Sequence, residues 1–330
     1  MQPAKTMTRF VIGFQRSLLC ALIFWHSVGH GLIEPAVSQR LFTPPLQPKA
    51  MYFTGAGIYF WWQAGCARYI QENCDYSTIP MIGASAGSLS ATLLLSNVDF
   101  TKAAQSALRI GSDAKVYERK GGLAGIWGSL LSTWLNEIIP DDVSEDTFQR
   151  LQIAVTPSLK TPKLVSGFSS KSDVIDACMA SCHVPVFLDG RPTTTFRGEQ
   201  VLDGSFWYFI TKDRTTGLPI PIDKKPDEIF WIDYCDDDDF MQSISGNILE
   251  LASPSKILDM MDDGYNFMKR EHYNGRLPLA RLKKPNFVYV ADFINGVEKF
   301  PQQFGSLPRK LINWADAADP MSKLLPPQFL

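Results

Sequence analysis

Five small residues between an apolar segment and a helical segment constrain this 330-residue chain more than any other feature of its sequence. Residues 83–87 read Gly-Ala-Ser-Ala-Gly; they follow the apolar run 78–82 and precede the helical pattern 88–95. A G-x-S-x-G segment in this position is typical of a strained strand-to-helix turn that lifts the serine hydroxyl clear of the sheet edge. Side chains larger than glycine would crowd that turn. The sequence therefore predicts a nucleophilic Ser85 in an elbow formed by Gly83 and Gly87.

Short apolar segments alternate with amphipathic segments along the rest of the chain. Strands are predicted at residues 50–54, 78–82, 151–155, 163–168, 199–202, 228–234 and 287–290. Helices are predicted at residues 58–73, 88–95, 99–118, 142–151, 171–181 and 257–273. Ser170 and Asp173 have the spacing of a capping box that opens the helix 171–181. This alternation predicts a single α/β domain with a largely parallel central sheet.

Composition excludes several classes of protein. A hydrophobic fraction of 45% supplies a large core, which excludes a disordered chain, a collagen-like repeat and a coiled coil. The net charge of −2 provides no basic field for nucleic acid. Four histidines and the absence of any C-x-x-C pair make a zinc site an unfavourable hypothesis. No apolar run reaches the ~18 residues of a membrane-spanning helix.

The first 45 residues have the character of a targeting segment and linker, and residues 46–330 are predicted to form the folded domain. Residues 1–33 contain no acidic residue, and a nine-residue apolar run at 17–25 follows three basic residues. This pattern is typical of a signal peptide and also suits a transit peptide, so we expect the secretory pathway, the endoplasmic reticulum or a plastid. A retained amphipathic helix is the alternative. Removal of the leader would leave five cysteines, which we expect to be mostly buried free thiols.

Two further motifs surround the elbow in sequence. Gly55-Ala56-Gly57 follows the first predicted strand, and glycines allow backbone N–H groups to approach a reacting carbonyl oxygen. The alternatives are a plain turn or a dinucleotide site, and Phe60 weakens the second because it stands where the third glycine would be. Asp203 ends the short strand 199–202 and is followed by glycine. Asp203 either points at the nucleophile or caps its own turn.

Taken together, these motifs resemble the patatin-like phospholipase family, and most closely its branch that contains adipose triglyceride lipase and adiponutrin. Ser85 follows Gly57 by 28 residues, which leaves room for one helix and one strand, the family's spacing. The resemblance covers most of residues 50–275. It is carried by YFTGAGIYFWWQAG at 52–65, IGASAGSLSA at 82–91, SKSDVIDACMASCHVPVF at 170–187, VLDGS at 201–205 and GYNF at 264–267.

The resemblance implies a three-layer α/β/α sandwich and a Ser-Asp dyad. By position, Ser85 would be the nucleophile and Asp203 the base, and the backbone of Gly55, Gly57 and Ile58 would form the oxyanion hole. The implied activity is hydrolysis of acyl esters in phospholipids, galactolipids or acylglycerols, without a metal or cofactor. The implied partner is a lipid substrate at a membrane or lipid-droplet surface. The chain departs from the family pattern at Phe53-Thr54, at Phe60 and at Ser205, and it has no arginine after Gly57.

Several alternatives remain open. The chain would otherwise be a lipid-binding regulator with weak activity, or an acyltransferase that uses the same acyl-enzyme. His272 or His183 would convert the dyad into a triad, although packing is the simpler role for His183. Residues 121–139, with two tryptophans, form either a core helix or a lipid-facing flap. The acidic run 236–239, with Asp233, suits a solvated loop better than a calcium site.

Overall fold

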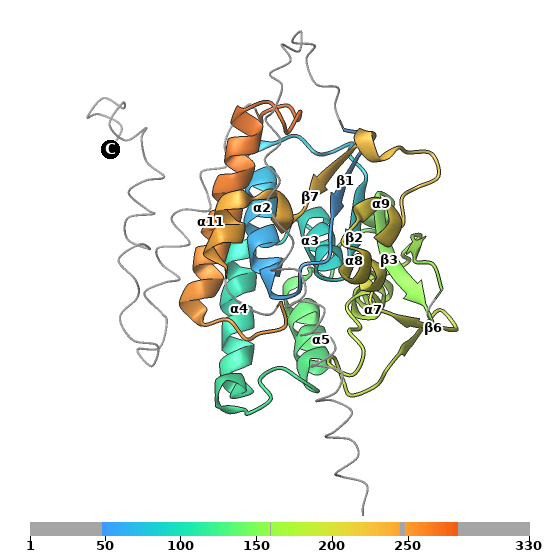
Figure 1. The fold of residues 1–330 in the computed structure, drawn as a ribbon, viewed down its shortest axis with the longest axis vertical. Helices are drawn as coiled ribbons and strands as arrows, with labels where there is room; N and C mark the ends of the chain where they lie inside the picture. The colour runs from blue at the N-terminus through green and yellow to red at the C-terminus, as the bar shows by residue number, and fades with distance from the viewer. Residues whose placement is uncertain (1–47, 159, 245–247, 283–330) are drawn as a thin grey trace, which may run out of the picture. The chain divides into compact units, whose positions relative to one another are not determined.

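A computed structural model describes residues 48–158, 160–244 and 248–282 (Figure 1). The predicted leader and the predicted strand 287–290 lie outside these residues. The described strands form a seven-stranded sheet with the order β5-β6-β3-β2-β1-β7, in which β4 also pairs with β3. The central strands are parallel: β1 (Ala50–Phe53), β2 (Met81–Ala84), β3 (Leu151–Pro157) and β7 (Ile229–Ile232). Antiparallel strands extend one end: β4 (Lys163–Val165), β5 (Thr194–Phe196) and β6 (Glu199–Leu202).

Helices connect the strands and cover the sheet. The larger ones are α2 (Phe60–Asn73), α3 (Ala86–Leu95), α4 (Phe100–Asp113), α5 (Trp127–Ile138), α7 (Lys171–Ser181) and α11 (Pro254–Tyr273). The shorter ones are α6 (Glu145–Phe148), α8 (Phe206–Thr211), α9 (Arg214–Gly217) and α10 (Asp238–Ser243). Single 3-10 turns occur at Gly57–Tyr59, Val116–Glu118, Pro226–Glu228 and Tyr234–Asp236.

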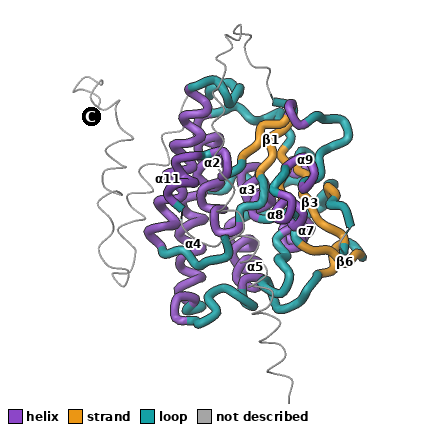
Figure 2. The backbone as a smooth tube through the Cα atoms, in the orientation of Figure 1, coloured by secondary structure: helices purple, strands orange, loops and turns teal. Residues whose placement is uncertain are grey.

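Alternate residues of each strand enter two different cores, as the two-residue period of a strand requires. Met51 and Phe53 of β1 face the large core, to which α2, α3, α4, α5, α7 and α11 contribute. Ala50 and Tyr52 face a smaller core with Tyr208 of α8. Figure 2 shows α2, α4 and α11 gathered on one side of the sheet. The result is a three-layer α/β/α sandwich with one thick helical layer and one thin layer.

Most predicted elements are present, and their ends depend on local capping. The cap of α7 is confirmed, since the Ser170 hydroxyl accepts the backbone N–H of Asp173 at 3.1 Å. The helix predicted at 99–118 ends at Asp113, and Lys115 follows with a φ of 51°. The helix predicted at 142–151 shrinks to the single turn α6. The predicted thiols are free, and Cys235 is the exposed one among those described.

The interpretation of the acidic run as a solvated loop is wrong for two of its carboxylates. Asp237 is buried, and it accepts a 2.9 Å hydrogen bond from the Trp62 indole and a 3.0 Å bond from Arg270. Asp233 is also buried, and it accepts bonds from Tyr208 and Arg214. These carboxylates anchor the chain after β7, because a buried charge requires such partners. The described residues contain no cluster of side chains suited to a metal ion.

Candidate active site

The nucleophile elbow has the geometry that its sequence predicts. Ser85 lies between β2 and α3 with a φ of 53° and a ψ of −127°, a conformation that non-glycine residues rarely adopt. A Cβ atom on Gly83 would lie 2.5 Å from the carbonyl oxygen of Gly87, and one on Gly87 would lie 2.1 Å from that of Phe53. Both glycines are therefore required by backbone that passes too close for any side chain.

Asp203 lies beside the elbow although it is distant in sequence. The Ser85 hydroxyl donates a 2.6 Å hydrogen bond to Oδ2 of Asp203. The other carboxylate oxygen, Oδ1, accepts the backbone N–H of Ser205 at 2.8 Å. Both side chains of the pair are buried. Burial raises the pKa of Asp203 to about 7, while the hydrogen bonds from Ser85 and Ser205 oppose that rise. Such a carboxylate is a much stronger base than one in water.

The glycine turn after β1 faces the same pocket as Ser85, but one predicted donor is already engaged. Gly57 and Ile58 line that pocket. The backbone N–H of Ile58 donates a 2.7 Å hydrogen bond to the carbonyl oxygen of Ile248, so Ile58 is not a free oxyanion donor in this structure. No described residue accepts a hydrogen bond from the N–H of Gly55 or Gly57, the other two predicted donors. Of these two, Gly57 lines the pocket, and its N–H is the remaining candidate for a developing oxyanion.

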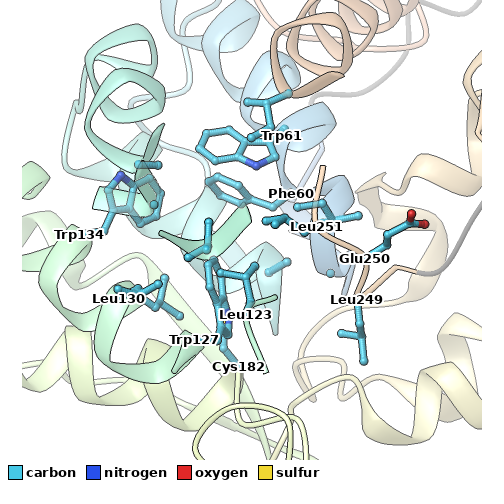
Figure 3. Close-up of a pocket in the computed structure, with 18 of the residues that line it drawn as sticks. Phe60, Trp61, Leu123, Trp127, Leu130, Trp134, Cys182, Leu249, Glu250 and Leu251 are labelled. Atoms are coloured by element: carbon cyan, nitrogen blue, oxygen red, sulfur yellow. The ribbon is translucent and has the colours of Figure 1, made fainter. Parts of the chain in front are cut away.

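A large apolar pocket opens beside the Ser85 hydroxyl (Figure 3). Its volume is about 1070 Å³, including the open solvent at its mouth. Aromatic side chains and leucines line it: Phe60, Trp61, Trp127, Trp134, Leu123, Leu130, Leu249 and Leu251. Glu250 is the one charged residue among the described lining residues, and Figure 3 places it on the side opposite Trp134. Such a lining suits a hydrocarbon chain and excludes a polar one.

The segment 121–139 contributes both to the core and to the wall of the pocket. Trp134 is buried in the core, where its indole donates a 2.8 Å bond to the carbonyl oxygen of Ala103. Trp127 is only partly buried and lines the pocket. The core interpretation therefore holds for the buried second half of the segment, which also lines the pocket through Trp134, and the lipid-facing flap stays a prediction. None of the described helices is long and apolar enough to span a membrane.

Comparison with known proteins agrees with this geometry. A sequence profile of the patatin-like phospholipase family matches residues 51–210, a range that includes both Ser85 and Asp203. This chain contains a patatin-like phospholipase domain. The mouse omega-hydroxyceramide transacylase is 26% identical over 171 residues, which are 49% of this chain and 28% of that protein.

Two human proteins are about as similar to this chain as the mouse transacylase is. A 1-acylglycerol-3-phosphate O-acyltransferase is 28% identical over 47% of this chain and 33% of its own length. Patatin-like phospholipase domain-containing protein 2 is 27% identical over 46% of this chain and 31% of its own length. The chain thus spans about a third of the curated relatives that it matches. VipD from Legionella pneumophila has a TM-score of 0.41 and 12% identity over 69% of this chain and 67% of its own.

The rings of the two histidines considered for a triad contact groups other than Ser85 and Asp203. The His272 ring contacts the Tyr69 hydroxyl at 3.0 Å and the carbonyl oxygen of Leu279 at 3.1 Å. The His183 ring contacts the carbonyl oxygen of Arg191 at 3.1 Å, and burial lowers its pKa. Neither ring bonds to Ser85, whose hydroxyl is already directed at Asp203. The geometry therefore favours the dyad over a triad.

One residue of the site was missed from the sequence. Ser181, the last residue of α7, contacts the backbone of Ser85 through its hydroxyl. It lies within the segment 170–187 that carries the family resemblance, but a serine at a helix end has too many ordinary roles to be singled out. Only the tertiary structure brings it to the elbow.

Proposed function

We propose that the patatin-like domain hydrolyses fatty-acyl esters of lipids through a Ser85–Asp203 dyad and an acyl-enzyme. The observation that carries the proposal is the 2.6 Å hydrogen bond from the Ser85 hydroxyl to a buried carboxylate whose pKa is raised to about 7. The apolar pocket beside Ser85 supports a long acyl chain as the substrate group. Phospholipids, galactolipids and acylglycerols at a membrane or lipid-droplet surface are the candidate substrates.

The reaction begins with attack of Ser85 Oγ on the ester carbonyl carbon. The proton of the Ser85 hydroxyl passes to Oδ2 of Asp203 as the carbon–oxygen bond forms, and the carbonyl oxygen becomes an oxyanion. The backbone N–H of Gly57, together with that of Gly55, stabilises this charge. When the tetrahedral intermediate collapses, the alcohol leaves with the proton from Asp203, and the acyl group stays on Ser85. Asp203 then takes a proton from water as the water oxygen attacks the acyl carbonyl carbon, and it returns this proton to Ser85 Oγ when the fatty acid leaves.

Acyl transfer is the second candidate, and it is favoured by the names of two of the similar proteins, a transacylase and an acyltransferase. The first half of the reaction would be the same. An alcohol would replace water in the second half, and an ester rather than a fatty acid would leave Ser85. The dyad itself does not distinguish these outcomes, because Asp203 would activate either acceptor.

Product analysis on the full chain tests both candidates. Wild type, Ser85→Ala and Asp203→Asn are incubated with mixed phospholipid and galactolipid vesicles and with a triacylglycerol emulsion. Ser77→Ala is the matched control, since Ser77 is exposed and its hydroxyl bonds only to Asp75. We expect fatty-acid release by wild type and the control, and a loss of ~10³-fold or more in the two dyad variants.

The same incubations with 1-acylglycerol-3-phosphate as an added acceptor identify transfer. A new diacyl product in place of fatty acid would favour the acyltransferase. A double variant with His183→Gln and His272→Gln should keep most of the activity. Full activity in Ser85→Ala would exclude both proposals.

A further inference from the structure

Ser181 is buried at the end of α7, and it bonds to the backbone of Ser85 and to that of Gly204, the residue after Asp203. Its hydroxyl accepts the backbone N–H of Ser85 at 2.8 Å. The same hydroxyl donates a 2.6 Å bond to the carbonyl oxygen of Ala154 in β3. Its own carbonyl oxygen accepts the N–H of Gly204, the residue after Asp203, at 2.9 Å. One residue therefore links the backbone of the nucleophile, a central strand and the backbone beside the base.

A second hydrogen bond fixes the backbone at Asp203, the base of the dyad. The N–H of Asp203 donates a 2.9 Å bond to the carbonyl oxygen of His183. Together with the bond from Gly204 to Ser181, it ties the backbone on both sides of the Asp203 carboxyl to the end of α7. The Thr156 hydroxyl also donates a 2.9 Å bond to the carbonyl oxygen of Asp203. The carboxylate thus has little freedom to move relative to Ser181.

On the side of the nucleophile, the hydroxyl of Ser181 satisfies a backbone group that is difficult to satisfy otherwise. Ser85 has a positive φ, and such a conformation persists only when its surroundings determine it strongly. A buried N–H left without a partner also costs free energy. The oxygen of the Ser181 hydroxyl both accepts the N–H of Ser85 and donates its hydrogen to the carbonyl oxygen of Ala154. Alanine has no group that forms these bonds, and the thiol of cysteine forms them only weakly.

We infer that Ser181 is the positioning residue that sets the distance between Ser85 Oγ and the Asp203 carboxylate. The inference rests on the proposed hydrolase function. Ser181 touches neither the substrate nor the reacting atoms, so its effect passes through the backbone of Ser85 and of Gly204. Loss of its hydroxyl releases the elbow from β3, and the 2.6 Å bond of the dyad lengthens. A misplacement of about 1 Å lowers a rate by ~10²-fold.

The dyad bond also reports on this geometry through the pKa of Asp203. The hydrogen bond from Ser85 lowers that pKa, so a longer bond raises it. The titratable groups next to Asp203 on the α7 side are the Cys182 thiol and the His183 ring. Burial raises the pKa of Cys182 and lowers that of His183, so both stay uncharged near neutral pH. A shift in the Asp203 titration therefore reports on its hydrogen bonds.

The test compares Ser181→Ala with Thr92→Val in the full chain. Thr92 is the matched control because its buried hydroxyl also lies between α3 and α7, where it contacts Cys178 Sγ at 3.2 Å but no residue of the dyad. Carboxyl titration by ¹³C NMR, assigned with Asp203→Asn, gives the pKa of Asp203 in each protein. Ester hydrolysis gives kcat and KM. We expect Ser181→Ala to raise the pKa of Asp203 and to lower kcat by ~10²-fold with KM nearly unchanged.

The control should change neither quantity. Should Ser181→Ala fail to fold, Ser181→Cys keeps most of the volume with a weak hydrogen-bonding group, and we expect a smaller shift in the same direction. An Asp203 pKa and a kcat equal to those of Thr92→Val would overturn the inference. The NMR titration does not require turnover, so it decides the role of Ser181 even if the hydrolase proposal fails in the Ser85→Ala comparison.

Discussion

The carbonyl oxygen of Ile248 accepts the backbone N–H of Ile58 at 2.7 Å, and it also lies against the Cα atom of Gly57. A Cβ atom on Gly57 would lie 2.3 Å from this oxygen, and the φ of Gly57 is 53°. The turn after β1 and the chain before α11 therefore meet through backbone, with no space for a side chain between them.

Replacement of Gly57 by alanine should disable this turn. We expect Gly57→Ala to lose at least ~10-fold in ester hydrolysis and to unfold at lower temperature, because the methyl group meets a backbone oxygen at an unfavourable φ. Gly121→Ala is the control, since a Cβ atom there meets nothing within 4 Å. Equal activity and melting temperature of the two variants would show that the turn tolerates a side chain.

The raised pKa of Asp203 predicts how activity depends on pH. A protonated carboxyl does not accept the proton of Ser85, so kcat/KM should fall as the pH decreases through about 7. The measurement is a pH–rate profile on a soluble short-chain ester, with each protein checked for folding by circular dichroism. An acidic limb near ~4, the ordinary range of aspartate, would show that Asp203 is not desolvated in solution.

The raised pKa of Asp203 also predicts that this residue lowers the free energy of unfolding at neutral pH. Unfolded aspartate titrates near ~3.9, so between that pH and about 7 the folded chain keeps a proton that the unfolded chain has lost. The free energy of unfolding therefore decreases as the pH rises through this window, and the full cost is present above it. Asp203→Asn should raise the melting temperature at about pH 8 and abolish hydrolysis, with the gain in stability shrinking toward pH ~4. A melting temperature below that of wild type at every pH would contradict this sign.

The pocket predicts a dependence on acyl-chain length. Ala107 lines the pocket from α4, so Ala107→Phe fills part of its volume. Hydrolysis of a long-chain ester should fall by ~10-fold or more, while that of a butyryl ester stays within about twofold, because only the long chain needs the filled space. The exposed Ala280 gives the matched Ala280→Phe control. A parallel loss for both esters would indicate damage to the dyad instead of the pocket.

Asp237, a buried carboxylate of the acidic run, is expected to stabilise the fold without a metal ion. Asp237→Ala leaves the Trp62 indole without its partner and Arg270 with only its pair to the exposed Asp239, and we expect the free energy of unfolding to fall by about 2 kcal/mol. This is below the ~3–5 kcal/mol typical of a fully buried pair, since the Arg270 side chain is 43% exposed. Asp239→Ala should change stability by less than ~0.5 kcal/mol, because that side chain is 83% exposed. A chelator should leave the melting temperature unchanged, and a decrease would revive the calcium interpretation.

The residues that meet in the candidate site differ in how far sequence could identify them. Gly83, Ser85 and Gly87 lie in one short motif, so their geometry depends on local backbone and was predictable. Asp203 could be identified only from its position at a strand end together with the family resemblance. Ile58 was predicted as a free donor, but the sequence carried no sign of the Ile248 carbonyl oxygen that its N–H meets.

Long-range pairing explains the other differences in the same way. The run 236–239 has the composition of a solvated loop, and nothing local indicates that Asp237 would meet Trp62 and Arg270. Trp127 and Trp134 lie on one helix and both line the pocket, yet only Trp134 is buried in the core. Ser181 is an ordinary helix-end serine until β2 and β3 place Ser85 and Ala154 beside it.

The two partners of the dyad are separated by 118 residues of chain. A ribosome adds ~5–20 residues per second, so roughly 6–24 s pass between synthesis of the nucleophile and synthesis of its base. The link through Ser181 also spans 96 residues. A nascent chain, or a fragment that ends before residue 203, therefore carries the elbow sequence without its base. Under the proposed function, ester cleavage would begin only after residue 203 has been synthesised and has folded beside the elbow.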